Sequence, residues 1–158
     1  MSAPGSAWRG YRRADFPHAS WSVEGDTLRA LGGAEPVSLI SRIRYADRDL
    51  SLQWRLPPGG NSGILYKVTE EYAEPWQSGP EMQLLGGLSH PDAQVPETSC
   101  GALYGLYPPK AMPPCAPGAA RVKGSKFAAF PAFANSAEGH IVLQHHGSDA
   151  WFRDIRIE

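Results

Sequence analysis

The chain has 158 residues and a formal net charge of −1, with 42% hydrophobic and 20% charged residues, which is the composition of an ordinary globular domain. The near-neutral charge argues against nucleic-acid binding through a basic surface, and no apolar run reaches the ~20 residues that a membrane span requires. The first residues lack a basic stretch followed by an apolar stretch, so the sequence as given predicts no secretory signal.

Short strands are predicted along the whole chain, because 17 glycines and 15 prolines interrupt it at short intervals. In chain order, these strands are residues 21–23, 27–31, 37–44, 48–56, 62–68, 80–85, 140–146 and 150–157. The clearest is 48–56, where apolar and polar side chains alternate. Residues 69–76 or 125–133 are the only candidates for a short helix, and 89–99 and 107–118 are Pro-rich loops. The pattern predicts an all-β fold, an antiparallel β-sandwich.

The two cysteines, Cys100 and Cys115, are too few for a disulfide scaffold. They are interpreted as two unrelated thiols or, if the protein is exported, as one disulfide that closes a loop. The absence of a Cys-x-x-Cys pair excludes a zinc ribbon and the thioredoxin type of redox motif.

Polar side chains share faces of three predicted strands. Strict alternation places Glu81 with Gln83, and Gln144 with His146, while Tyr66 lies on the strand that follows Asn61. If these strands are neighbours, a carboxylate, an imidazole, amides and an aromatic ring converge on one open sheet, which suits a sugar site. The simpler alternative is a solvated outer face, because antiparallel sheets commonly have one.

Histidines suggest a metal site only weakly. His145, His146 and Asp149 lie close in sequence, and His90 and Asp92 form a second imidazole–carboxylate pair. Adjacent histidines on a strand point to opposite faces, and no spacing matches a known zinc pattern. Nucleophilic catalysis has even less support, because no Gly-x-Ser-x-Gly motif is present.

Five ordered motifs carry a family resemblance over most of the chain from Trp8 to Ile157. They are WRLPPGGNSGI at 54–64, GPEMQLL at 79–85, GALYGLY at 101–107, GHIVLQ followed by HG within 139–147, and WFRDIRI at 151–157. Together they resemble the 3-keto-disaccharide hydrolase family. The resemblance implies one domain over residues 1–158, a concanavalin A-like jelly roll with a ligand groove on its concave sheet. Family members are generally exported by bacteria.

The implied reaction is cleavage of a glycosidic bond in a sugar already oxidised to a ketone at C3. The ketone acidifies the C2 proton, so a base removes this proton, the C1 substituent leaves and water adds back. The expected site comprises Glu81 and His146 as base and acid, in an order left open, with Asn61, Tyr66, Gln83, Gln144, Trp151 and Arg153 contacting the sugar. A divalent metal that polarises the ketone would suit this chemistry, although the sequence specifies none.

The chain also departs from the family pattern. Gly86 and His145 stand where the family has aspartates, and a first strand and a hairpin near 121–125 are missing. We expect these changes to weaken metal binding and acid–base catalysis and to expose a sheet edge that a second copy or another chain can cover. The alternatives are therefore an active or impaired enzyme, a non-catalytic carbohydrate-binding module using the same sheet, and an unstable structural remnant.

Overall fold

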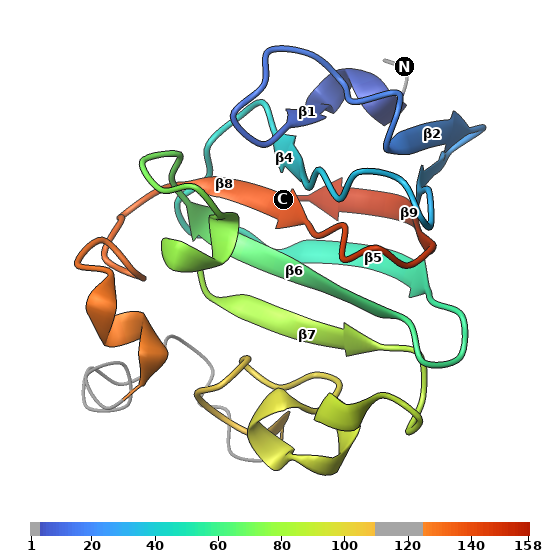
Figure 1. Cartoon of the computed structure of the whole chain (residues 1–158). Helices are drawn as coiled ribbons and strands as arrows, with labels where there is room; N and C mark the ends of the chain where they lie inside the picture. The colour runs from blue at the N-terminus through green and yellow to red at the C-terminus, as the bar shows by residue number, and fades with distance from the viewer. Residues whose placement is uncertain (1–3, 110–124) are drawn as a thin grey trace.

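The computed structural model describes residues 4–109 and 125–158, which form two packed antiparallel sheets (Figure 1). The five-stranded sheet has the order β1-β4-β8-β6-β7, and the four-stranded sheet has the order β2-β3-β9-β5. The strands are β1 (Trp8–Gly10), β2 (Trp21–Glu24), β3 (Thr27–Ala30), β4 (Leu39–Ser41), β5 (Leu50–Arg55), β6 (Asn61–Val68), β7 (Glu81–Leu85), β8 (His140–Leu143) and β9 (Ala150–Ile157). The predicted all-β sandwich is confirmed.

The helical elements in these residues are short 3₁₀ turns, and none is long and apolar enough to cross a membrane. They are η1 (Pro4–Ala7), η2 (Pro75–Gln77), η3 (Pro91–Gln94), η4 (Pro96–Thr98) and η6 (Lys126–Ala129). Four of them begin with proline, whose fixed φ suits a first helical position. Of the two segments considered for a helix, 69–76 overlaps η2 at its end and 125–133 contains η6.

The strand predictions differ from the structure mainly at their ends. The prediction for 150–157 matches β9, whereas β8 ends at Leu143 rather than at residue 146. β1 was not predicted, because three residues are too few to show a period of two. The expected missing hairpin lies almost entirely in residues outside the described ranges, as does Cys115, so those predictions stay untested. Cys100 is exposed.

The main core lies between the two sheets. Trp21 and Phe152 contribute from the four-stranded sheet, and Leu39, Ile64 and Leu143 from the five-stranded sheet. All five are almost completely buried. Burying a large apolar side chain contributes ~1.5–3 kcal/mol, so these contacts fix which face of each strand points outward.

The outer face of the five-stranded sheet is partly covered by residues 69–79, which follow β6. Ile40, Leu65 and Val142 lie next to core residues in sequence, so they point away from the inter-sheet core, yet they are fully buried. Tyr11 and Trp76 pack against them. This segment brings the Trp76 ring onto the outer face, toward the β7 edge.

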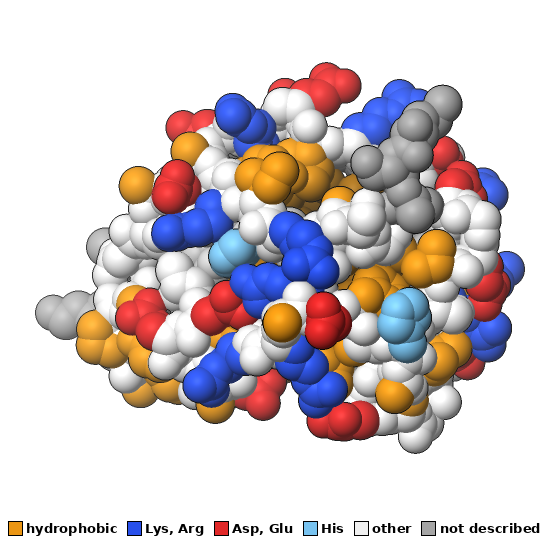
Figure 2. Space-filling model, turned by 90° about the horizontal axis from the view of Figure 1, so that it is seen from above, with side chains coloured by type: hydrophobic (Ala, Val, Ile, Leu, Met, Phe, Trp, Pro, Cys, Tyr) orange, Lys and Arg blue, Asp and Glu red, His pale blue; other side chains and the backbone are white. Residues whose placement is uncertain are grey.

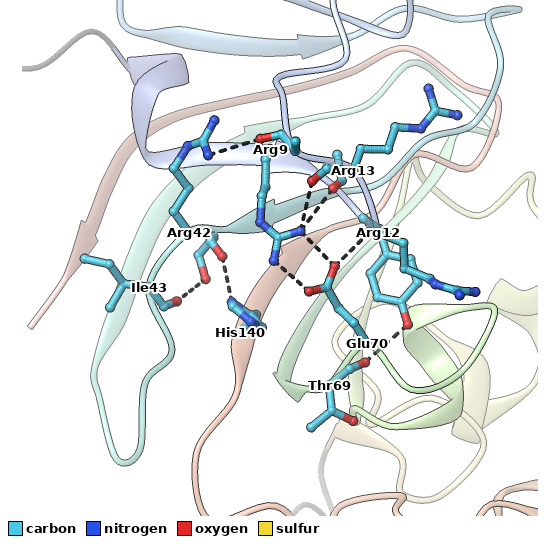
Figure 3. Close-up of polar contacts among 12 residues, drawn as sticks. Arg9, Arg12, Arg13, Arg42, Ile43, Thr69, Glu70 and His140 are labelled. Atoms are coloured by element: carbon cyan, nitrogen blue, oxygen red, sulfur yellow. Dashed lines mark hydrogen bonds and ion pairs between the residues drawn. The ribbon is translucent and has the colours of Figure 1, made fainter.

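An ion pair fastens the same segment to β1 (Figure 3). The Arg9 guanidinium donates two hydrogen bonds to the Glu70 carboxylate, at 2.8 and 2.7 Å, and the backbone N–H of Arg12 donates a third at 2.8 Å. The Tyr11 hydroxyl donates to the carbonyl of Tyr72 at 2.9 Å. Figure 2 shows basic and acidic side chains interspersed on the face seen from above.

Candidate active site on the outer face of β6 and β7

Glu81 lies flat across the neighbouring strand. In the β6–β7 ladder, Leu65 is opposite Glu81 and Gly63 is opposite Gln83. A Cβ atom on Gly63 would lie 2.1 Å from Oε1 and 2.8 Å from Cγ of Glu81. The missing side chain of Gly63 therefore provides the volume that the Glu81 carboxylate occupies, which gives this glycine a role beyond strand geometry.

The pKa of Glu81 is raised from 4.5 to about 7. Burial is the largest cause, because it disfavours the charged carboxylate, and the negative charge of Asp92 adds to the rise. The positive charge of Lys126 and a side-chain hydrogen bond with Gln144 act in the opposite direction. Near pH 7 both protonation states are populated, so Glu81 is suited to accept a proton and to return it.

Two buried amide oxygens lack partners on the face of the sheet that carries Glu81. The backbone N–H of Gln144 donates to the carbonyl of Gly63 at 2.9 Å, which extends the β6 ladder beyond β8. Gln144 and Asn61 are 9% and 8% exposed, and Oε1 of the former and Oδ1 of the latter accept no hydrogen bond. A buried acceptor without a donor costs ~1–3 kcal/mol, so both atoms are suited to ligand hydroxyl groups.

Asp92 forms a second polar group next to β7, and sequence reasoning did not include it in the site. Its Oδ2 accepts a hydrogen bond from the buried Gln83 side chain at 3.4 Å and lies 3.8 Å from Nδ1 of His90. The pKa of Tyr104 is raised, chiefly by burial and then by the negative charges of Asp92 and Glu81. The only sequence signal for Asp92 was its pairing with His90 in a Pro-rich loop.

Lys126 completes the site and was also missed. Its Nζ lies 4.7 Å from the ring centroid of Tyr104 and 5.1 Å from those of Trp76 and Phe127. Three elements distant in sequence supply these rings, so no local pattern in the sequence predicts the arrangement. The result is a cation against an aromatic wall, on the Glu81 side of the sheet.

Tyr66 belongs to the surroundings of this wall. Ile64, two residues before it, faces the core between the sheets, but the pairing of β6 with β8 shifts register between Leu65 and Val68, where Lys67 has a φ of 55°. Tyr66 packs against the cluster that also contacts Trp76. Strict alternation along β6 would place Ile64 and Tyr66 on one face, and this irregularity breaks the alternation.

The other predicted residues separate into two groups. His146 is exposed, in the loop after β8, and continues the chain from Gln144. Trp151 and Arg153 lie on β9 of the four-stranded sheet and flank Phe152, which points into the core. Both therefore face away from the core, and the structure does not bring them to Glu81.

Trp151 has a different role on that outer surface. The guanidinium carbon atoms of Arg29 and Arg55 lie 5.3 and 4.2 Å from its ring centroid, and Arg153 donates to the Gln53 side chain at 3.0 Å. The family resemblance suggested Trp151 and Arg153 for the groove, whereas in this structure both lie on β9 of the four-stranded sheet and face away from the core.

The two departures from the family pattern do not remove acids from the outer face. His145 is buried beside Trp21, accepts the N–H of Gly147 at Nδ1, and has Nε2 3.1 Å from the carbonyl of Leu31. Burial lowers its pKa. A Cβ atom on Gly86 would lie 1.8 Å from the carbonyl oxygen of Pro57. His145 and Gly86 therefore both make close packing contacts in this chain.

No three His, Cys, Asp or Glu side chains within residues 4–109 and 125–158 are grouped closely enough to hold a metal ion. The carboxylate of Asp149, one of the residues considered for a metal, instead pairs with Arg29 at 3.2 Å. These residues therefore do not supply a ligand set for a divalent metal.

The chain was compared with known families, curated proteins and solved structures. The model of the 3-keto-alpha-glucoside-1,2-lyase-like domain matches residues 4–123. A protein of Bacteroides thetaiotaomicron named 3-keto-disaccharide hydrolase is 26% identical over 219 aligned positions, covering 97% of this chain and 74% of the relative.

Two crystal structures from Parabacteroides distasonis, both of proteins provisionally described as glycosyl hydrolases, share the fold. One has a TM-score of 0.78 at 23% identity and covers 97% of this chain and 88% of its own. The other has a TM-score of 0.64 at 19% identity and covers 96% and 98%. Because the family model spans well over half of the sequence, the chain belongs to the 3-keto-alpha-glucoside-1,2-lyase-like domain family.

Proposed function

We propose that this protein cleaves 3-keto-glycosides by elimination across C1 and C2 followed by hydration, with Glu81 as the base. The observation that carries this proposal is the Glu81 carboxylate, which lies over Gly63 with its pKa raised to about 7, on the same face of the sheet as two unpartnered amide oxygens. Family membership and the name of the Bacteroides relative support the choice of substrate class.

The reaction balances without an oxidant or reductant. Glu81 takes the C2 proton, the electron pair of that C–H bond forms C2=C3, and the carbonyl pair moves to the C3 oxygen as an enolate. The enolate re-forms the ketone as C1=C2 forms and the C1–O bond breaks, and the departing oxygen takes a proton. Water then adds its oxygen to C1 and a proton to C2, which completes a net hydrolysis.

Each neighbouring residue has a task in this scheme. Asn61 and Gln144 accept hydrogen bonds from sugar hydroxyl groups, because their oxygens are buried and unpartnered. The Tyr104 and Trp76 rings offer an apolar surface to the sugar ring, with Tyr66 packed in the same cluster. His146 is our candidate for the acid that protonates the leaving oxygen, since it is exposed and follows Gln144 by two residues.

The test is release of p-nitrophenol from the p-nitrophenyl 3-keto-β-glucoside and its α-anomer, beside the unoxidised glucosides. We expect cleavage of a keto compound alone, at least ~100-fold slower in Glu81→Gln and in His146→Ala. Glu97→Gln, which changes an acid elsewhere on the loop, is the control and should retain wild-type turnover. If folded wild-type protein binds a glucoside or a keto-glucoside but cleaves none of these compounds, the protein is a carbohydrate-binding module. Wild-type turnover by Glu81→Gln would overturn the assignment of the base.

A further inference from the structure

Lys126 holds its charge in an unusual way for a surface lysine. Its Nζ is surrounded by the rings of Trp76, Tyr104 and Phe127, and none of the ion pairs found in the described part of the chain includes it. Aromatic faces stabilise a cation through their quadrupoles, without a carboxylate that would neutralise it. The ammonium charge is therefore fixed in place and remains available to a ligand.

Tyr104 links this cation to the proposed base, because its backbone N–H donates to the Glu81 carbonyl at 2.9 Å while its ring centroid lies 4.7 Å from Nζ of Lys126. The charge of Lys126 favours the ionised form of Glu81, yet no Glu81 oxygen lies within ion-pair distance of Nζ. In a 3-keto sugar, the proton to be removed is on C2 and the oxygen that gains charge is on the adjacent C3. A carboxylate and an ammonium that both adjoin Tyr104 match these two neighbouring atoms.

We propose that the Lys126 ammonium binds the C3 carbonyl oxygen and stabilises the negative charge that develops there as Glu81 removes the C2 proton. This inference rests on the proposed function. The Lys126 nitrogen forms no covalent bond to the sugar and keeps its three protons. The electron pair released at C2 forms C2=C3, and the carbonyl electron pair moves to the C3 oxygen. Lys126 thereby polarises the ketone, a task that a divalent metal could also perform but for which the described residues offer no ligand set.

The same arrangement distinguishes a ketone from an alcohol at C3. A C3 alcohol has no C=O π bond into which the electron pair from C2 can delocalise, so no enolate forms for the cation to stabilise. Other charged or titratable groups around Glu81 are Asp92 from η3 and Tyr104 from the loop after β7, and neither carries a positive charge. Among the groups that act electrostatically on Glu81, only Lys126 has the sign that an enolate requires.

The first experiment compares Lys126→Met and Lys126→Arg with wild type on the 3-keto-glucoside, as kcat and KM from pH 5 to 9. Lys67→Met, the other lysine in the described ranges, is the matched control. We expect Lys126→Met to lower kcat at least ~100-fold with a smaller change in KM. The pH profile of kcat/KM should move to higher pH, because the positive charge that favours ionised Glu81 is lost. Lys126→Arg should restore a tenth or more of the activity. Unchanged kcat and pH profile in Lys126→Met would overturn the proposal.

A second experiment keeps the inference testable if wild type shows no turnover. Calorimetry compares binding of 1,5-anhydro-3-keto-glucitol, which has no leaving group, with binding of the corresponding C3 alcohol. We expect wild type to prefer the ketone and Lys126→Met to lose this preference, while Lys67→Met retains it. Equal preferences in wild type and Lys126→Met would contradict the role of Lys126, whatever the protein does in the turnover assay.

Discussion

The Glu81 carboxylate occupies the position that a side chain on Gly63 would require, since a Cβ atom there would lie only 2.1 Å from Oε1. Gly63→Ala must therefore displace the Glu81 side chain. Since the new methyl group meets only side-chain atoms of Glu81, the β6 backbone can stay in place. We expect turnover to fall at least ~10-fold with a small change in melting temperature.

A double-mutant cycle separates this effect from general damage. If Gly63 acts through Glu81, Gly63→Ala costs little further activity in a Glu81→Gln background, because the group that it displaces is already inactive. Independent, multiplicative losses in the double variant would show that Gly63 supports the site by another route.

The raised pKa of Glu81 makes stability depend on pH. The unfolded carboxyl ionises around 4.5 and the folded one around 7, so the folded state loses stability as pH rises through this window. The full effect corresponds to ~3 kcal/mol. Glu81→Gln lacks this ionisation, so we expect its stability relative to wild type to increase from pH 4 to pH 8.

Urea unfolding at pH 4, 6 and 8 measures this difference directly. His146→Ala serves as a comparison, because the His146 side chain is exposed and its removal leaves the Glu81 carboxyl in place. A constant difference between Glu81→Gln and wild type at pH 4, 6 and 8 would mean that the Glu81 carboxyl is not desolvated in solution.

Asn61 should contribute to ligand binding and little to folding. Its Oδ1 is buried without a donor, so Asn61→Ala removes an unsatisfied group from the free protein and one acceptor from the complex. We expect sugar affinity to fall about tenfold while the melting temperature stays constant or rises. Calorimetry with the sugar and a thermal melt of the free protein test both parts. A large loss of stability with unchanged affinity would assign Asn61 to the fold.

Glu70 is expected to stabilise the segment that brings Trp76 onto the sheet. Burial opposes ionisation, but the hydrogen bonds with Arg9 outweigh it and hold the pKa of Glu70 below 4.5. This contribution is present above pH 4.5 and is lost as pH falls through the lowered pKa. Glu70→Gln should destabilise the protein by ~1–3 kcal/mol at pH 7 and speed proteolysis within residues 69–79.

The matched control is Glu35→Gln, which removes a similar contact with Arg13 at an exposed position. Exposed pairs contribute ~0–1 kcal/mol, so this variant should melt close to wild type. Equal melting temperatures for Glu70→Gln and wild type would mean that the Arg9 contact does not hold the segment in solution.

Strand periodicity predicted much of this molecule but not its assembly. The sandwich, β9 and the grouping of Glu81 with Gln83 follow from side chains that alternate along an extended chain. The family resemblance, not the alternation, suggested Trp151 for the groove, and neither of them reveals which sheet a strand joins. Asp92 and Lys126 lie in short 3₁₀ turns, whose positions depend on contacts distant in sequence.

The contact between Gly86 and Pro57 has a consequence for protein engineering. The N–H of Gly59 donates to the carbonyl of Gly86 at 2.8 Å, and the N–H of Gly86 donates to the carbonyl of Gly60 at 2.9 Å. The Pro57 carbonyl fills the place of a side chain at 86. Grafting the aspartate of other family members onto this position alone would force two backbone segments apart. A substitution at position 86 therefore has to be combined with a redesigned 57–60 turn, because the two segments are packed against each other.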